Sequence, residues 1–233
     1  MRHKLVVVTS LCLMLLGFTF SHAALLGIKG SLGYPDIMFG DGTVTYSYYD
    51  SKNEGYFTLE ATDLILTLSS GDEYYLSGKD FTTKLFVAVY LSIDPQGEPG
   101  FQKGYMSEWV DKGSINVGQN TYKVNDLLLF GYITKFGWGT GPDLGSFDML
   151  IELDPKESLF VKDQIWRYDV LTGMYFKATK LSGWDGSWTK DFKLYEAEGD
   201  KAPVPIPPSI LLFGSGFGLF CFRKLVNLTG RRS

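Results

Sequence analysis

Three carboxylates at the end of one alternating segment are the strongest candidates for catalysis. Glu152, Asp154 and Glu157 form a Glu-x-Asp-x-x-Glu pattern. Residues two apart on a β-strand lie on the same face, about 6.6 Å from each other, and glycoside hydrolases use two carboxyl groups about 5 to 9.5 Å apart. The spacing of Glu152 and Asp154 therefore suits acid/base chemistry on a glycosidic bond.

The same pattern resembles the signature of a jelly-roll family of glycoside hydrolases, in which glutamates on one strand act as nucleophile and acid/base. The resemblance implies a glycoside hydrolase that uses Glu152, Asp154 and Glu157. Pro155, however, interrupts the strand before Glu157, and so short a pattern arises by chance among 26 acidic residues. We therefore favour an ordinary strand end here, predict no catalytic residues, and keep the glycoside hydrolase as an alternative.

The segment between the two ends of the chain has no imidazole and no thiol. Outside residues 24–200 lie both histidines and both cysteines, namely His3, His22, Cys12 and Cys221. Zinc sites, disulfides, cysteine nucleophiles and serine–histidine triads all need one of these groups. We therefore expect a protein that is not an enzyme.

Aromatic residues make up 15% of the chain, and all five tryptophans lie within residues 24–200. Trp138 lies among glycines, and Trp184 and Trp188 flank a short Asp-Gly-Ser segment. Rings on loops beside acidic groups could stack on sugars, as in a carbohydrate-binding module. Packing in the core or across strands is the alternative, and we favour it for any single tryptophan.

Acidic residues dominate the same segment. It carries 26 acidic and 15 basic side chains, a net charge of −11, so we predict no nucleic-acid partner, which would need a basic face. Several acids lie in glycine-bearing turns, where they could bind Ca²⁺ weakly outside the cell: Asp41, Asp72, Glu73, Asp143 and Asp185. The sequence has no Asp-x-Asp-x-Asp-Gly loop. We therefore predict no dedicated metal site and no cofactor, and attribute the charge to surface solvation.

The elements that must position these residues have the pattern of β-strands with one buried face. Apolar and polar residues alternate with a period of two over residues 44–48, 57–61, 64–68, 85–93, 127–134, 147–153, 164–170, 174–179 and 192–195. Turns rich in glycine, proline and aspartate separate these segments. The pattern predicts one all-β domain over residues 24–200, built as an antiparallel β-sandwich or jelly roll.

The N-terminal residues have the order of a secretory signal peptide. Arg2 and Lys4 give a positive start, residues 5–20 are almost continuously apolar, and Ser21-His22-Ala23 is a small-x-small cleavage site. An uncleaved anchor is the alternative, but the apolar run is short for a membrane span of about 20 residues. We predict a signal peptide over residues 1–23, cleavage by signal peptidase after Ala23, and export across the inner membrane.

Residues 201–233 hold a proline-rich linker, an apolar segment and a basic tail. Four of the nine prolines lie between Pro203 and Pro208 and predict an extended linker. Residues 210–222 would span about 20 Å as a helix, which makes a thin transmembrane anchor. Arg223 and Lys224 would stop transfer and hold the C-terminus in the cytoplasm. A buried core helix is the alternative, which the all-round apolarity disfavours.

This C-terminal arrangement resembles the PEP-CTERM sorting domain of Gram-negative bacteria, which the membrane peptidase exosortase processes. Val204-Pro205-Ile206-Pro207 matches the Val-Pro-Glu-Pro motif except at Ile206, residues 212–216 match its apolar Gly-Ser-Gly helix, and Arg223-Lys224 match its arginines. The resemblance implies secretion, a transient anchor in the inner membrane, and cleavage near the prolines by an exosortase-like peptidase. It is typical of bacteria that make exopolysaccharide.

Together these features predict a secreted protein with a structural or adhesive role at the cell surface or in the extracellular matrix of a biofilm. The first alternative is a carbohydrate-binding module for extracellular polysaccharide, with Trp138, Trp184 and Trp188 as stacking residues. The second is the glycoside hydrolase described above.

Overall fold

The alternating segments of the sequence form long antiparallel strands. The computed structural model describes residues 25–28, 33–167 and 169–204. Its strands are β1 (Asp36–Tyr49), β2 (Glu54–Thr67), β3 (Glu73–Tyr75), β4 (Thr82–Ile93), β5 (Pro99–Lys112), β6 (Ser114–Val117), β7 (Asn120–Lys123), β8 (Leu127–Trp138), β9 (Ser146–Leu153), β10 (Thr172–Lys180) and β11 (Phe192–Pro203). The helical turns are η2 (Asp50–Lys52), η3 (Gly141–Asp143) and α2 (Leu159–Lys162).

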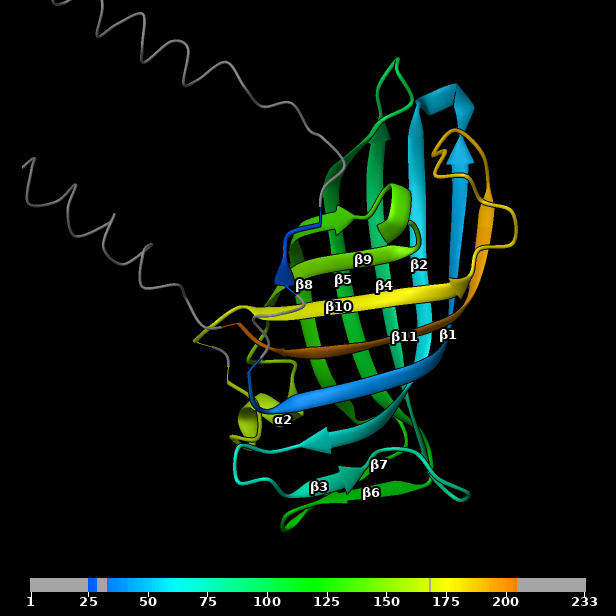
Figure 1. The fold of residues 1–233 in the computed structure, drawn as a ribbon. Coiled ribbons are helices and arrows are strands. Elements are labelled where there is room, and N and C mark those ends of the chain that lie inside the picture. The colour runs from blue at the N-terminus through cyan, green and yellow to red at the C-terminus, as the bar shows by residue number, and fades with distance from the viewer. Residues whose placement is uncertain (1–24, 29–32, 168, 205–233) are drawn as a thin grey trace, which may run out of the picture.

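Hydrogen bonds join eight of these strands into one closed antiparallel barrel. The strand order is β1-β11-β10-β9-β8-β5-β4-β2, and β1 also pairs with β2, which closes the ring. In Figure 1, β9, β10 and β11 cross the front of the barrel, steeply inclined to β8, β5, β4 and β2 behind them. β3 pairs with the end of β2, and β6 and β7 form a separate hairpin.

The all-β antiparallel class predicted from the sequence is confirmed. The expected β-sandwich or jelly roll is not confirmed, because the pairing of β1 with β2 makes the sheet continuous. Within the part of the chain that the structure describes, no helix has the length and apolarity needed to cross a membrane. The predicted signal peptide with Ala23, and the tail from Pro205 through Arg223 and Lys224, lie outside the described residues.

β1 can pair with two neighbours because it bends at a bulge. Asp41 has a φ of 53°, and the register with β11 shifts between Phe39 and Gly42 and again between Gly42 and Thr43. The register with β2 shifts between Gly40 and Thr43. A bulge bends its strand and increases the local twist, so β1 can pair with β11 on one side and with β2 on the other.

The apolar phase of each strand fills the barrel interior. On β4, the alternating residues Leu85, Val87, Val89, Leu91 and Ile93 are all buried, as predicted. This is the packing of an eight-stranded barrel, whose interior is just wide enough for side chains. Burial of this alternating set fixes which face of each strand points inward.

Two segments differ from the prediction. The predicted strand over residues 164–170 is wrong, because residues 164–166 form turns and Gln164 adopts a φ of 59°, which redirects the chain. At the C-terminal limit, β11 continues to Pro203, beyond the predicted end of the domain at residue 200. Lys201 and Ala202 are fully buried, so they belong to the barrel and not to a linker.

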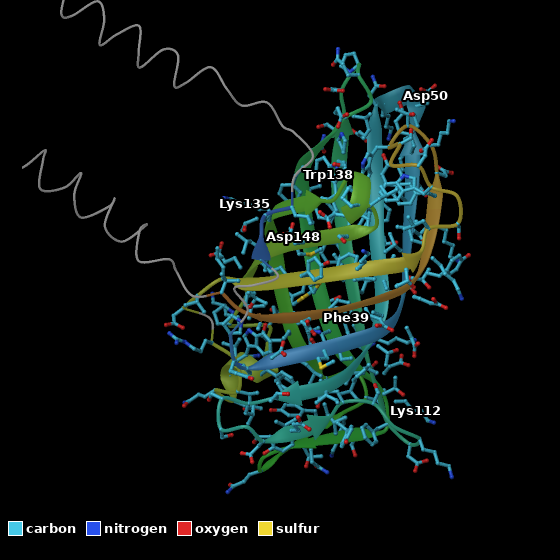
Figure 2. All side chains as sticks on the ribbon, in the orientation of Figure 1. Phe39, Asp50, Lys112, Lys135, Trp138 and Asp148 are labelled. Atoms are coloured by element: carbon cyan, nitrogen blue, oxygen red, sulfur yellow. The ribbon has the colours of Figure 1, made fainter. Side chains whose placement is uncertain are left out.

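The chain enters and leaves the barrel at neighbouring positions. The N–H of Gly33 donates to the carbonyl of Pro203 at 3.1 Å, and that of Val204 donates to the carbonyl of Leu171 at 2.8 Å. The N–H of Leu26 donates at 2.9 Å to Oδ1 of Asp148, a buried residue of β9 that Figure 2 labels. These contacts fix residues that follow the predicted signal peptide and the first residues of the segment 201–233 that was predicted as linker and tail.

Candidate functional site

The predicted catalytic carboxylates lie at an exposed strand end. Glu152 is exposed on β9, which ends at Leu153. Asp154 starts the turn that follows, where its Oδ1 accepts the N–H of Lys156 at 2.8 Å. Glu157 is exposed in the same turn. Asp154 therefore stabilises the turn after β9, and the two glutamates face solvent; the absence of catalytic residues stays a prediction.

Trp138, Trp184 and Trp188 pack in the barrel core. Their exposed fractions are 5%, 8% and 3%, and Figure 2 labels the first of them. The ring of Trp188 lies edge-on to both of the others, with centroid distances of 5.6 Å. The Tyr46 hydroxyl donates to the carbonyl of Trp188 at 2.8 Å. Because other rings cover them, these tryptophans stabilise the core and present no open face to a sugar.

Of the five acidic residues that the sequence places in turns, Asp72 and Asp185 stabilise their own turns, whereas Asp41 lies in β1 and Glu73 in β3. Oδ2 of Asp72 accepts the hydroxyl of Ser70 at 2.7 Å, and Oδ1 of Asp185 accepts the N–H of Ser187 at 3.0 Å. Among residues 25–28, 33–167 and 169–204, no three His, Cys, Asp or Glu side chains are grouped so that they could hold a metal ion. Weak Ca²⁺ binding at single turns stays a prediction.

A groove on the outer surface of the barrel unites side chains that the sequence analysis did not single out. It spans β2, β4 and β5, has a volume of about 440 Å³, and is lined by residues that include Tyr49, Glu54, Tyr56, Tyr90, Gln102 and Lys103. Tyr56 and Tyr90 are direct cross-strand partners whose ring centroids lie 4.9 Å apart. Lys103 lies opposite Tyr90 on β5 and places its Nζ 5.0 Å from the centroid of that ring.

Aromatic side chains continue from this groove along β5 and β8. Tyr105 lies opposite Tyr132, and the ring of Phe130 lies 6.5 Å from that of Tyr105 and 5.3 Å from that of Tyr132. Phe86 on β4 is 6.0 Å from Tyr105. Tyr90 and Tyr132 are 37% and 56% exposed. We call this set, together with Tyr56, the outer aromatic surface.

The groove can bind a molecule that has both an apolar face and hydroxyl groups. Burial, with the nearby Tyr105 and Tyr90, raises the pKa of Tyr56 to about 12, so its phenol stays protonated and keeps its donor. Gln102 offers both donor and acceptor, and Lys103 offers donors and a cation. Rings on a rigid sheet with polar groups at their edge provide stacking and hydrogen bonding together.

A second cluster lies in the barrel interior, where one lysine contacts two carboxylates. Asp63 on β2, Glu108 on β5 and Lys201 on β11 have no exposed surface. Nζ of Lys201 contacts Oδ1 of Asp63 and lies 2.8 Å from Oε2 of Glu108. Phe39, labelled in Figure 2, marks the position of the cluster, since its ring centroid lies 5.6 Å from the same nitrogen.

Burial controls the protonation of this interior cluster. Desolvation raises the pKa of Asp63, and desolvation together with the charge of Asp63 raises the pKa of Glu108 to about 8. Desolvation alone would lower the pKa of Lys201, but the two carboxylates outweigh it and raise that pKa. One ammonium cannot balance two carboxylates, so the cluster holds an additional proton at neutral pH, on Glu108.

A signal for the interior cluster is present in the sequence. Asp63 continues the buried phase that includes Ala61, and Glu108 lies between Met106 and Val110 in the buried phase of β5. A charged residue in the apolar phase of a strand must point into the core. The tyrosines of the groove lie in the opposite phase, which the alternation alone assigns to solvent.

Comparison with known proteins gives no match. No protein-family model, curated protein or solved structure matches the chain. The groove and the interior cluster are therefore the features of the molecule that bear on its function.

Proposed function

We propose that this is a secreted, non-enzymatic adhesive protein that binds extracellular polysaccharide through the groove on β2, β4 and β5. The observation that carries the proposal is the pair of Tyr56 and Tyr90 with Lys103 beside it, on the outside of a closed barrel. A sugar ring presents C–H groups to an aromatic face and hydroxyls to the polar groups at its edge. In the groove, Tyr56 and Tyr90 offer aromatic faces to the C–H groups, and Gln102 and Lys103 offer hydrogen-bonding groups to the hydroxyls.

The charge of the molecule favours a neutral polysaccharide. The net charge of −11 over residues 24–200 would repel a polyanion. The groove itself mixes Lys103 with Glu54, so it suits hydroxyl groups better than a charged group of one sign. The outer aromatic surface continues to Tyr132 on β8, which favours an extended polymer over a single sugar.

The proposed sorting signals would deliver the barrel to such a polymer. The signal peptide ending at Ala23 would direct export, and the PEP-CTERM-like tail beginning at Val204 would hold the protein in the inner membrane until an exosortase-like peptidase cuts it. Release would leave the barrel at the cell surface or in the matrix. The adhesive role follows from binding polymer at that location.

Replacing Tyr90 tests the proposal. In pulldown with the exopolysaccharide of the producing organism, or on a glycan array, Tyr90→Ala should weaken binding about tenfold, because it removes a stacking ring worth about 1.4 kcal/mol. Tyr75→Ala is the matched control, since Tyr75 is 66% exposed and pairs with Ile65, at the opposite end of β2 from Tyr56. Equal binding by both variants, or no binding by the wild type, would contradict the proposal.

A further inference from the structure

The side chains of the interior cluster meet where the barrel excludes water. The cross-strand neighbours of Asp63, Glu108 and Lys201 include buried apolar residues on four strands: Ile37, Phe39, Leu85, Leu129 and Met174. A primary amine and two carboxyl groups are therefore held in contact inside an apolar core. Isolated charges are costly in such a place, which favours any reaction that removes them.

We propose that Lys201 and Asp63 react with each other to form an intramolecular isopeptide bond, with Glu108 as the catalytic residue that transfers the proton. Nζ of Lys201 contacts the Asp63 carboxyl group and lies 2.8 Å from Oε2 of Glu108. Within the described residues, Oδ2 of Asp63 and both carboxyl oxygens of Glu108 make no hydrogen bond, so neither carboxyl group is engaged outside its ion pair with Lys201. Nucleophile, electrophile and proton carrier are already adjacent.

The reaction balances without any other reactant. The neutral amine of Lys201 attacks Cγ of protonated Asp63, which forms the C–N bond of a tetrahedral intermediate. Glu108, which starts protonated, gives its proton to the departing hydroxyl group and accepts one from the nitrogen, so the C–O bond breaks and one water molecule leaves. The product is an amide between Nζ and Cγ. No atom changes oxidation state, and Glu108 returns to its starting form.

Burial supplies the protonation states that this step needs. Desolvation raises the pKa of Asp63 and, with the charge of Asp63, that of Glu108 to about 8, so both carboxyl groups take up protons readily. The two carboxylates raise the pKa of Lys201, so its neutral amine forms only by transfer of a proton within the cluster. Transfer from the Lys201 ammonium to Asp63 replaces two buried charges by two neutral groups, which lowers the desolvation cost. The amide then removes the ion pair permanently.

The bond joins the last strand of the barrel to the second. Asp63 and Lys201 are 138 residues apart in the chain, so the cross-link spans nearly the whole domain. Residues 24–200 contain no cysteine, and disulfides are therefore not available to them as cross-links. Lys201 also lies just before Val204, where the proposed tail begins. A force on that tail would reach β11 next to the bond.

Peptide mass spectrometry of the full chain tests the inference. The purified protein is unfolded, cut after lysine and arginine, and analysed by tandem mass spectrometry. An amide-bonded lysine is not a cleavage site, so residues 53–79 should appear joined to a peptide that starts at Leu194 and runs through Lys201. Their mass should be lower than the sum of the two peptides by one water. If the wild type yields the free peptides 53–79 and 194–201 and no joined peptide, the proposal is overturned.

The same digest contains an internal control. Lys84 and Asp111 form an ion pair at 3.2 Å on the surface, where their side chains are 51% and 37% exposed. Solvent keeps both groups charged, so cleavage after Lys84 should be complete and its peptide should stay separate from the one with Asp111. Joined peptides at this pair as well would show that proximity alone suffices, and would contradict the role given to burial and Glu108.

Three variants separate the roles. Lys201→Arg keeps the charge but removes the amine, and should abolish the joined peptides. Glu108→Gln keeps the size but cannot transfer the proton, and should reduce the joined fraction at least tenfold. Asp63→Asn should still react, with ammonia leaving in place of water, and give a joined pair of the same mass as the wild type.

If the joined peptides persist in Lys201→Arg, Lys201 does not supply the amine. If the joined fraction is unchanged in Glu108→Gln, Glu108 does not transfer the proton. Circular dichroism establishes that each variant folds. Should one fail to fold, the wild-type digest still decides.

Discussion

At the residue scale, the surroundings of an aromatic ring decide whether it binds or packs. Tyr90 is 37% exposed and lies beside Tyr56 on an outer face, whereas Trp188 is 3% exposed. The ring of Trp188 contacts those of Trp184 and Phe192, with centroids 5.6 and 5.4 Å away. Tyr90 therefore belongs to the outer aromatic surface, whereas Trp188 packs in the core, the alternative that the sequence analysis favoured for any single tryptophan.

Trp188→Ala should destabilise the fold by about 3–5 kcal/mol, because it leaves a cavity among rings that cannot close around it. Urea unfolding followed by far-UV circular dichroism measures the loss. Tyr75→Ala, which removes a ring that is 66% exposed, should change stability by less than about 0.5 kcal/mol. A Trp188 variant as stable as that control would show that the tryptophan does not pack in the core.

A half-buried carboxyl group at the start of β1, that of Asp36, makes stability depend on pH. Burial, helped by the negative charge of Asp200 and opposed by Lys201, raises the pKa of Asp36 from 3.8 to about 6. Its Oδ1 is buried without a hydrogen-bond partner in the described part of the chain. Between about pH 4 and pH 6 the folded protein therefore binds a proton that the unfolded chain has released, and stability falls as the pH rises through this range.

Asp36→Asn should remove this contribution. The variant and the wild type should have similar free energies of unfolding near pH 4, and the variant should be more stable by about 1–2 kcal/mol above pH 6, after allowance for solvent screening. Urea unfolding at several pH values measures the difference, and the other carboxylates cancel in the comparison. A difference that does not change between pH 4 and pH 6 would contradict the raised pKa.

At the scale of single elements, the bend in β1 allows this strand to pair with both β11 and β2. Gly42 lies in the bulge, and a Cβ atom there would come within 2.7 Å of the carbonyl oxygen of Ala197 on β11. The neighbouring Asp41 has a φ of 53°, a left-handed conformation that glycine adopts more easily. Gly42 therefore allows the close approach of β1 to β11, whereas Asp41 supplies the left-handed backbone conformation of the bulge.

Gly42→Val should destabilise the barrel by about 1–3 kcal/mol, because a side chain at this position must push β11 away. Asp41→Gly is the matched control, since it relieves the left-handed strain while adding freedom to the unfolded chain, and should change stability by less than about 0.5 kcal/mol. Chemical denaturation measures both. A tolerated Gly42→Val would mean that β1 and β11 do not approach as closely as the bulge requires.

Period-two alternation predicts the strands because each has one buried face. It succeeds for residues 85–93, where every second residue faces the core. It fails for residues 164–170, where Gln164 adopts a left-handed conformation in a turn and the buried Trp166 donates its Nε1–H to Oγ1 of Thr172 at 3.0 Å. Alternation cannot predict which strands are neighbours, because the pairing of β1 with β11 depends on contacts between residues far apart in the chain.

The groove and the complete interior cluster could not be predicted from the sequence, for different physical reasons. The outer tyrosines become a surface only when β2, β4 and β5 are placed side by side in register. Asp63 and Glu108, by contrast, are visible as charged residues in an apolar phase, but their partner Lys201 lies next to a proline-rich segment that predicts a linker. A single strand cannot show that two buried acids share a base on a distant strand.

At the scale of the whole molecule, β11 completes the barrel and leads directly to the proposed sorting tail. Its last residues pair with both neighbours, since Lys201 lies opposite Ile37 on β1 and Met174 on β10. The carbonyl of Pro203 also accepts the N–H of Gly33. A peptidase that releases the protein from a membrane must therefore cut after Val204 to leave the barrel whole.

Two truncated proteins test this limit of the domain. A chain of residues 24–204 should fold and unfold cooperatively in urea, because every strand of the barrel is complete. A chain of residues 24–200 lacks Lys201 and leaves Asp63 and Glu108 buried with no cation, which costs about 3–5 kcal/mol in addition to the lost strand pairing. That is a large share of the stability of a domain, so the shorter protein should be unfolded or aggregated by circular dichroism and size-exclusion chromatography. A shorter protein that folds as well as the longer one would show that the last residues of β11 and the interior lysine are dispensable for closing the barrel.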